Sequence, residues 1–147
     1  MSRLAFTLAV AFLPAPMHSQ ECGASLSAKQ LANLTEMARR VIETGAYTGW
    51  DEKAFERAGD LGSIAIVRAL PQDGSVNPVQ MRSVLLLVRE SFSCLDRCVQ
   101  SSDDKEPRVT LLLLEHLREH GPPDTRSDVE EVQTFVLKQT EVARHAK

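Results

Sequence analysis

The feature that most constrains this chain is a long apolar stripe that recurs at helical spacing. Asn77-Pro78 is a helix start signal, because asparagine caps a helix and the missing N–H of proline has no intrahelical partner in the first turn. The stripe that follows consists of Met81, Val84, Leu85, Val88, Phe92, Leu95 and Val99. Leu86 and Leu87 widen it, so other elements must cover most of this helix. We therefore expect it to be the central helix of a domain.

Three further segments before it are expected to be helical. Ser27-Ala-Lys-Gln30 is a capping box that predicts a helix ending at Gly45, and residues 52–58 can form two more helical turns. Asp60 is expected to cap the next segment, 61–70, whose short apolar run suits either a helix or a buried strand. We favour the helix, because a lone strand would leave its backbone groups without partners.

The C-terminal half repeats these signals. Glu106-Pro107 resembles the Asn77-Pro78 start and predicts a helix over 109–117. Ser127-Asp-Val-Glu130 is a second capping box that opens a last helix, which we expect to pack on the two apolar helices before it. The chain is therefore predicted to be all-α, a compact bundle or short stack of five to six helices.

The N-terminus reads as a secretory signal peptide over residues 1–19. Arg3 precedes an apolar run over 4–13, and a proline-broken stretch follows it, with cleavage expected before Gln20. The run is shorter than the about 20 residues that a transmembrane helix needs. We expect an exported protein, periplasmic or secreted, whose mature part, residues 20–147, is a single helical domain with no membrane span.

Composition excludes several classes of function. The formal net charge is −3, and no basic block is longer than Arg39-Arg40, so nucleic acid is not an expected partner. No phosphate-binding loop, dinucleotide fingerprint or catalytic set is present, and we expect no cofactor and no catalytic residue. Tyr47 and Trp50 are expected to cover one end of the core, with a ligand or partner contact as the alternative.

The stretch from Asp51 to His120 resembles the stacked helical hairpins of HEAT-type α-solenoids. The resemblance lies in helix lengths and apolar positions over about half of the chain, with no clear internal repeat. It implies a scaffold that binds other proteins.

One motif points instead to metal chemistry. His116-Leu-Arg-Glu119-His120 matches the H-x-x-E-H signature of inverzincin peptidases, in which two histidines on one helix face hold zinc and the glutamate activates water. Only a short segment follows His120, and Gly121-Pro-Pro123 ends the helix there. A histidine beside an apolar stripe is more often a half-buried packing residue.

Export changes the interpretation of the cysteines. Cys94 and Cys98 are four residues apart, which allows a local disulfide near the end of the central helix, although free buried thiols are an equal alternative. Cys22 could pair with either of them or stay free. Asn33 begins an Asn-Leu-Thr sequon, which would be glycosylated only in a eukaryotic host and on an exposed face.

These observations favour an exported, non-catalytic helical domain that acts by binding another protein. The alternative is a small zinc-dependent hydrolase that uses His116, Glu119 and His120. The sequence identifies neither the partner nor the oligomeric state.

Overall fold

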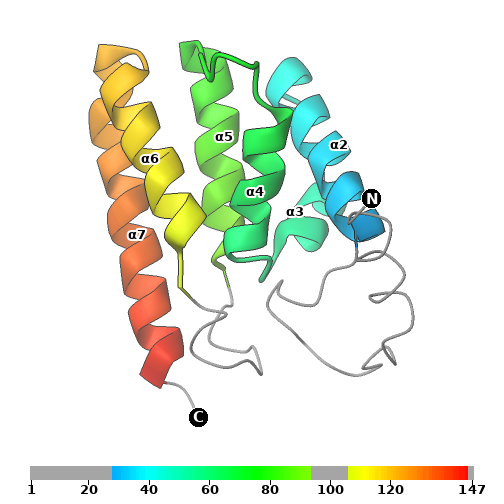
Figure 1. The fold of residues 1–147 in the computed structure, drawn as a ribbon, viewed down its shortest axis with the longest axis vertical. Coiled ribbons are helices and arrows are strands. Elements are labelled where there is room, and N and C mark those ends of the chain that lie inside the picture. Colours follow the sequence, from blue (N-terminus) through cyan, green and yellow to red (C-terminus); the bar gives the residue numbers. More distant parts are fainter. Residues whose placement is uncertain (1–27, 94–105, 146–147) are drawn as a thin grey trace, which may run out of the picture.

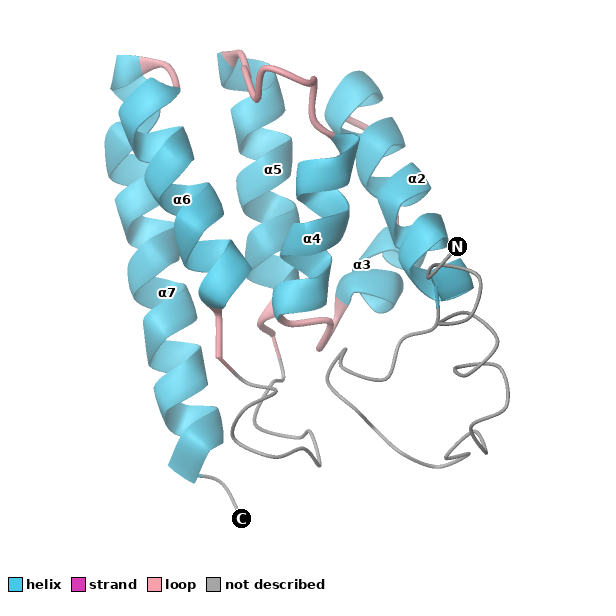
Figure 2. Cartoon of the chain, in the orientation of Figure 1, coloured by secondary structure: helices cyan, strands magenta, loops and turns pink. Residues whose placement is uncertain are grey.

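The computed structural model describes residues 28–93 and 106–145, and all of the regular structure within these ranges is helical (Figures 1 and 2). In chain order the elements are α2 (Ala28–Thr44), α3 (Gly49–Phe55), α4 (Asp60–Ala69), α5 (Pro78–Ser91), α6 (Arg108–His120), the 3-10 turn η3 (Pro123–Thr125) and α7 (Arg126–His145). The predicted all-α class is confirmed, and the ambiguous apolar run over 61–70 is a helix.

The predicted central helix is α5, which packs against α2, α3, α4 and α7. In Figure 1, α4 lies in front of α5 and α6 lies in front of α7, and each of these pairs is antiparallel. As expected, α7 packs on both α5 and α6. α5 ends at Ser91, and Leu95 and Val99 of the predicted stripe lie outside the described residues.

The core lies where the apolar faces of these helices meet. Its largest fully buried side chains come from α2 to α7 and include Val41, Phe55, Ile66, Leu87, Leu114 and Val129. Burying one side chain of this size contributes about 1.5–3 kcal/mol, so the core provides most of the driving force for folding. No described helix combines the length and the hydropathy that crossing a membrane would need.

Several helix boundaries follow the local signals. The Asn77 side chain accepts a hydrogen bond from the Gln80 amide at 2.8 Å, and the Gln80 side chain accepts one from the Asn77 amide at 3.0 Å. Gly45 ends α2 with a φ of +77°, a conformation that glycine adopts without strain. A capping box between Thr48 and Asp51 begins α3, which therefore starts before the predicted segment 52–58.

The prediction that Asp60 caps α4 was wrong. Gly59 occupies the N-cap position without a side-chain bond, and Asp60 is the first residue of α4. Its carboxylate instead accepts hydrogen bonds from the backbone amides of Val109 and Thr110, both at 2.8 Å. These amides are unpaired donors at the start of α6, where the helix dipole also favours a negative charge. Asp60 therefore caps a helix that lies about fifty residues further along the chain.

Two other predicted starts also shift. Pro107 is the N-cap residue of α6 and not its first helical residue, so its position differs from that of Pro78. Ser127 is the second residue of α7 and not its cap, because η3 continues directly into α7 at Arg126. The proposed signal peptide, residues 1–19, and all three cysteines, Cys22, Cys94 and Cys98, lie outside the described residues.

Candidate functional site

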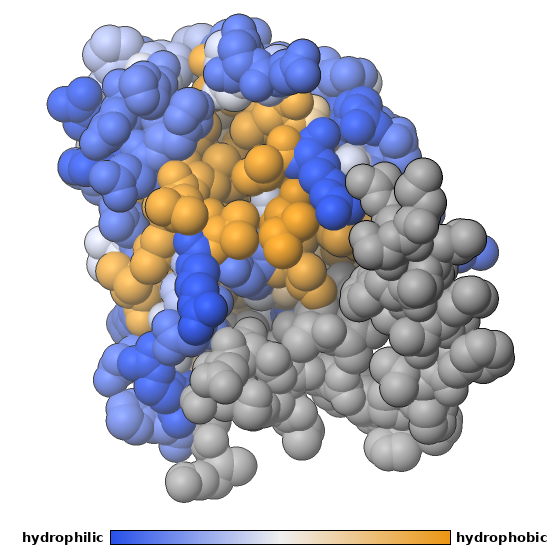
Figure 3. Space-filling view, viewed as in Figure 1, coloured by the Kyte–Doolittle hydropathy of each residue, from blue (hydrophilic) through white to orange (hydrophobic). Residues whose placement is uncertain are grey.

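An apolar groove lies between α4 and α6 near the C-terminal end of α4. Figure 3 shows apolar atoms gathered over this face of the molecule, with polar side chains around them. The groove has a volume of about 420 Å³ and is lined by Val67, Leu70, Pro71, Gln72, Asp73, Gly74, Val109, Leu112, Leu113 and His116. The side chain of Leu112 is 70% exposed and that of Val67 is 47% exposed. Contiguous exposed apolar surface of this kind is typical of a binding site.

The groove forms because α6 carries two apolar faces. Leu113, Leu114 and Leu117 point into the core and are buried. Leu112 lies beside this stripe, and together with Val109 it forms the α6 wall of the groove. A helix this apolar needs neighbours on more than one side, but α4 and α7 cover only part of it.

A tight turn closes one end of the groove. Asp73 accepts hydrogen bonds from the amide and hydroxyl of Ser75 at 3.0 and 2.8 Å, and these bonds lower the pKa of the Asp73 carboxyl. Gly74 has a φ of +73°, and its carbonyl oxygen lies 3.2 Å from Nε2 of His116. The turn is thus joined to α6, and it places a carboxylate that is ionised at neutral pH at the end of a mostly apolar groove.

The residues of the predicted zinc motif occupy the C-terminal turn of α6. The rings of His116 and His120 are close, with centroids 4.9 Å apart. His116 is half-buried, whereas Glu119 and His120 are exposed. In residues 28–93 and 106–145, no three or more His, Cys, Asp or Glu side chains are grouped so that they could hold a metal ion. His116 and His120 are thus close to each other, but no third ligand is grouped with them within these ranges, and the zinc site stays a prediction.

The two aromatic residues near α3 behave differently from each other. Tyr47 packs against the core and its hydroxyl donates to a Glu90 carboxylate oxygen at 3.2 Å. Burial and the negative charge of Glu90 raise the pKa of Tyr47 well above its ordinary value. Trp50 was expected to cover the core and does not, because its side chain is 82% exposed on the first turn of α3.

A chain of buried polar groups joins α4 to α6. The hydroxyls of Ser63 and Thr110 are 2.6 Å apart, and the Thr110 hydroxyl donates to Asp60 at 2.7 Å. Both hydroxyl residues are closed to solvent, so this chain of hydrogen bonds fixes two helices together and offers no nucleophile to a substrate.

Comparison of this chain with protein-family models, with curated proteins and with solved structures found no match.

Proposed function

We propose that this chain is an exported, non-catalytic domain that binds an amphipathic helix of a partner protein in the groove between α4 and α6. The observation that carries this proposal is the apolar groove itself, with Leu112 and Val67 exposed on opposite walls. A groove between two helices accepts the apolar face of a third helix, a recurring mode of peptide recognition. Asp73 at one end favours a partner with a basic residue at the matching position.

The exposed apolar side chains set the scale of the expected affinity. Covering Leu112 and Val67 would contribute about 1–2 kcal/mol each at 25 cal/mol per Å² of buried apolar area. A charged side chain in the same place would remove this gain and would be desolvated without a partner. We therefore expect Leu112→Glu to weaken partner binding at least about 30-fold.

The test is affinity purification from the exported fraction of the native host, followed by reconstitution with the purified partner. The wild-type chain and a control, Leu137→Glu, should retain the same protein, because Leu137 is a 47% exposed residue of α7 outside the groove. Leu112→Glu should lose it, and calorimetry with the purified partner should show the fall in affinity. Equal binding by all three chains, or no partner retained by any of them, would contradict the proposal.

Sedimentation of the purified chain separates this proposal from self-association. If the wild-type chain dimerises and Leu112→Glu is a monomer, the groove holds a second copy and the partner proposal is wrong.

Export is part of the same proposal and rests on the pattern of residues 1–19. Fractionation of the host should place the chain outside the cytoplasm, and its intact mass should lack those residues. A full-length chain in the cytoplasm would contradict it.

A scaffold role is supported by the pairing of α4 with α5 and of α6 with α7 as neighbouring antiparallel hairpins. This arrangement is compatible with the resemblance to HEAT-type solenoids, which we retain as part of the proposal.

The zinc hydrolase is the second candidate, favoured by the close approach of the rings of His116 and His120. Elemental analysis of the purified chain tests it. One zinc per chain, lost in His116→Ala, would support this candidate, and a zinc content unchanged by that substitution would remove it.

A further inference from the structure

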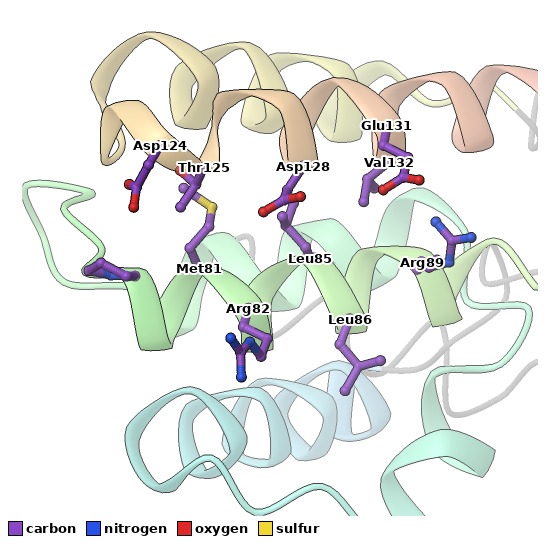
Figure 4. Close-up of a pocket in the computed structure, with 11 residues that line it drawn as sticks. Met81, Arg82, Leu85, Leu86, Arg89, Asp124, Thr125, Asp128, Glu131 and Val132 are labelled. Atoms are coloured by element: carbon purple, nitrogen blue, oxygen red, sulfur yellow. The ribbon is translucent and has the colours of Figure 1, made fainter.

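A second groove, of about 640 Å³, lies between α5 and α7 (Figure 4). Its floor is apolar and is formed by Met81, Leu85, Leu86 and Val132. Met81, Leu85 and Val132 are almost completely buried, and only Leu86, at 37% exposed, offers much apolar surface. Apolar contact alone would therefore give a ligand little binding energy in this groove.

The two walls of the groove carry opposite charges. The α5 wall is basic, with Arg82 and Arg89, and the α7 wall together with η3 is acidic, with Asp124, Asp128 and Glu131. All five side chains are exposed. Within residues 28–93 and 106–145 none of them takes part in an ion pair. The charged groups on both walls are thus available to a ligand.

The spacing of these residues matches the period of a helix. On α5 the lining positions are 78, 81, 82, 85, 86 and 89, and on α7 they are 128, 131 and 132. The two helices run in the same direction along the groove (Figure 4). Arg82 and Arg89 are seven positions apart on α5, which is about 10.5 Å or two helical turns. On the other wall Asp128 and Glu131 are about one turn apart on α7, and Asp124 on η3 extends this row of carboxylates. A helix bound between the two walls would therefore have charged groups of the groove along both of its flanks, about one or two helical turns apart.

Arg89 is held at the edge of the groove by an aromatic ring. Its guanidinium carbon lies 4.4 Å from the centroid of the Phe135 ring on α7. This cation–π contact restricts the side chain without neutralising it. The positive charge is therefore positioned before a ligand arrives.

We infer that the α5–α7 groove binds an amphipathic helix with an acidic flank and a basic flank. The acidic flank lies along the two arginines of α5, and the basic flank lies along the three carboxylates of η3 and α7. The apolar residues of the bound helix cover the floor of the groove, mainly at Leu86. This site uses different helices from the α4–α6 groove, so the two sites can fail independently.

The probe is a fluorescein-labelled synthetic helix of 18 residues with leucines on one face, glutamates on one flank and lysines on the other. Reversing a helix in a groove exchanges its flanks, so a peptide with exchanged flanks is no control. The control is a peptide of the same composition in which glutamate and lysine alternate on both flanks. A third peptide carries lysine on both flanks. Binding is measured by fluorescence anisotropy at low and high salt.

The wild-type chain should bind the probe peptide, with glutamates on one flank and lysines on the other, at least about tenfold more tightly than the control peptide. The control peptide places like charges against each wall, and facing like charges oppose binding. Raising the salt concentration from 0.05 to 0.5 M should weaken this binding several-fold, because exposed charges are screened within about 4 Å at that ionic strength. Equal affinity for the two peptides, binding that is insensitive to salt, or no binding of either peptide would overturn the inference.

Charge reversal on α5 tests the assignment of the walls. Arg82→Glu with Arg89→Glu makes both walls acidic. This double variant should no longer bind the probe peptide and should bind the peptide with lysine on both flanks. The matched control is Arg68→Glu with Arg108→Glu, an equal change in net charge at exposed positions outside this groove. Asp128→Lys is a further variant in case the double variant unfolds. It should weaken binding of the probe peptide several-fold. If the control double variant has the same effect as the α5 variant, net charge and not the groove explains the binding.

Discussion

Replacing Asp60 by alanine should destabilise the fold by about 2–4 kcal/mol. The carboxylate accepts three hydrogen bonds, from the amides of Val109 and Thr110 at 2.8 Å and from the Thr110 hydroxyl at 2.7 Å. Losing an ordinary N-cap costs about 1 kcal/mol. Here the bonds are charge-assisted and Thr110 is buried, so an unpaired donor adds about 1–3 kcal/mol.

Urea denaturation followed by far-ultraviolet circular dichroism measures this loss. With a slope of about 2 kcal/mol per M, the midpoint should fall by about 1–2 M. Asp60→Asn should cost less than Asp60→Ala, because its amide oxygen can still accept one of the backbone bonds. Hydrogen exchange should show faster exchange at the first amides of α6 in both variants.

A double-mutant cycle with Thr110→Val tests whether the two side chains act together. The coupling energy between Asp60 and Thr110 should be about 0.5–3 kcal/mol, as for residues in one hydrogen-bond network. A loss below about 0.5 kcal/mol in Asp60→Ala, which is the range of ordinary surface substitutions, would refute the capping role of Asp60.

Three further predictions concern the core and the titration of the chain. Gly62→Ala should cost about 1–3 kcal/mol in thermal unfolding, because the new Cβ would clash with Oγ of Ser91 and would lie 2.8 Å from its Cβ. Adding Ser91→Ala removes Oγ but keeps Cβ, so it should recover only part of this loss. Leu114→Ala, at a fully buried site, should cost about 2–5 kcal/mol in the same assay. The only tyrosine, Tyr47, should ionise above the ordinary pKa of 10.0 in an absorbance titration, and Glu90→Gln should bring its pKa closer to that value. Because its pKa is raised in the folded state, Tyr47 stabilises the fold fully below pH 10 and loses this contribution as the pH rises through the folded-state pKa. A Tyr47 pKa that is the same in folded and denatured chains would contradict this cause.

Most helices could be predicted because their signals are local. Asn77 and Gln80 satisfy each other within one turn, and Gly45 ends its helix by its own backbone conformation. The starts of α4 and α6 could not be predicted in this way. The acceptor of the α6 amides is Asp60, and nothing near Pro107 in the sequence indicates that a carboxylate from another helix will lie there.

The candidate site was less predictable than the fold. The apolar pattern around Leu112 predicts a helix, but it does not show which side of a broadly apolar helix stays uncovered. Trp50 shows the same limit, since an aromatic residue expected in the core is exposed. Neither wall of the α5–α7 groove was recognised, because Arg82 and Asp128 are separate surface charges until α5 and α7 lie side by side.

The sequence by itself determined the all-α class, the central position of α5 and the inward faces of most helices. Periodicity and capping act within a few residues of one another, so one segment is enough to specify them. Only the tertiary structure decided which apolar faces remain open and which charged residues line one groove. Both depend on contacts between helices that are far apart in the chain, where the spacing of residues in sequence gives no distance in space.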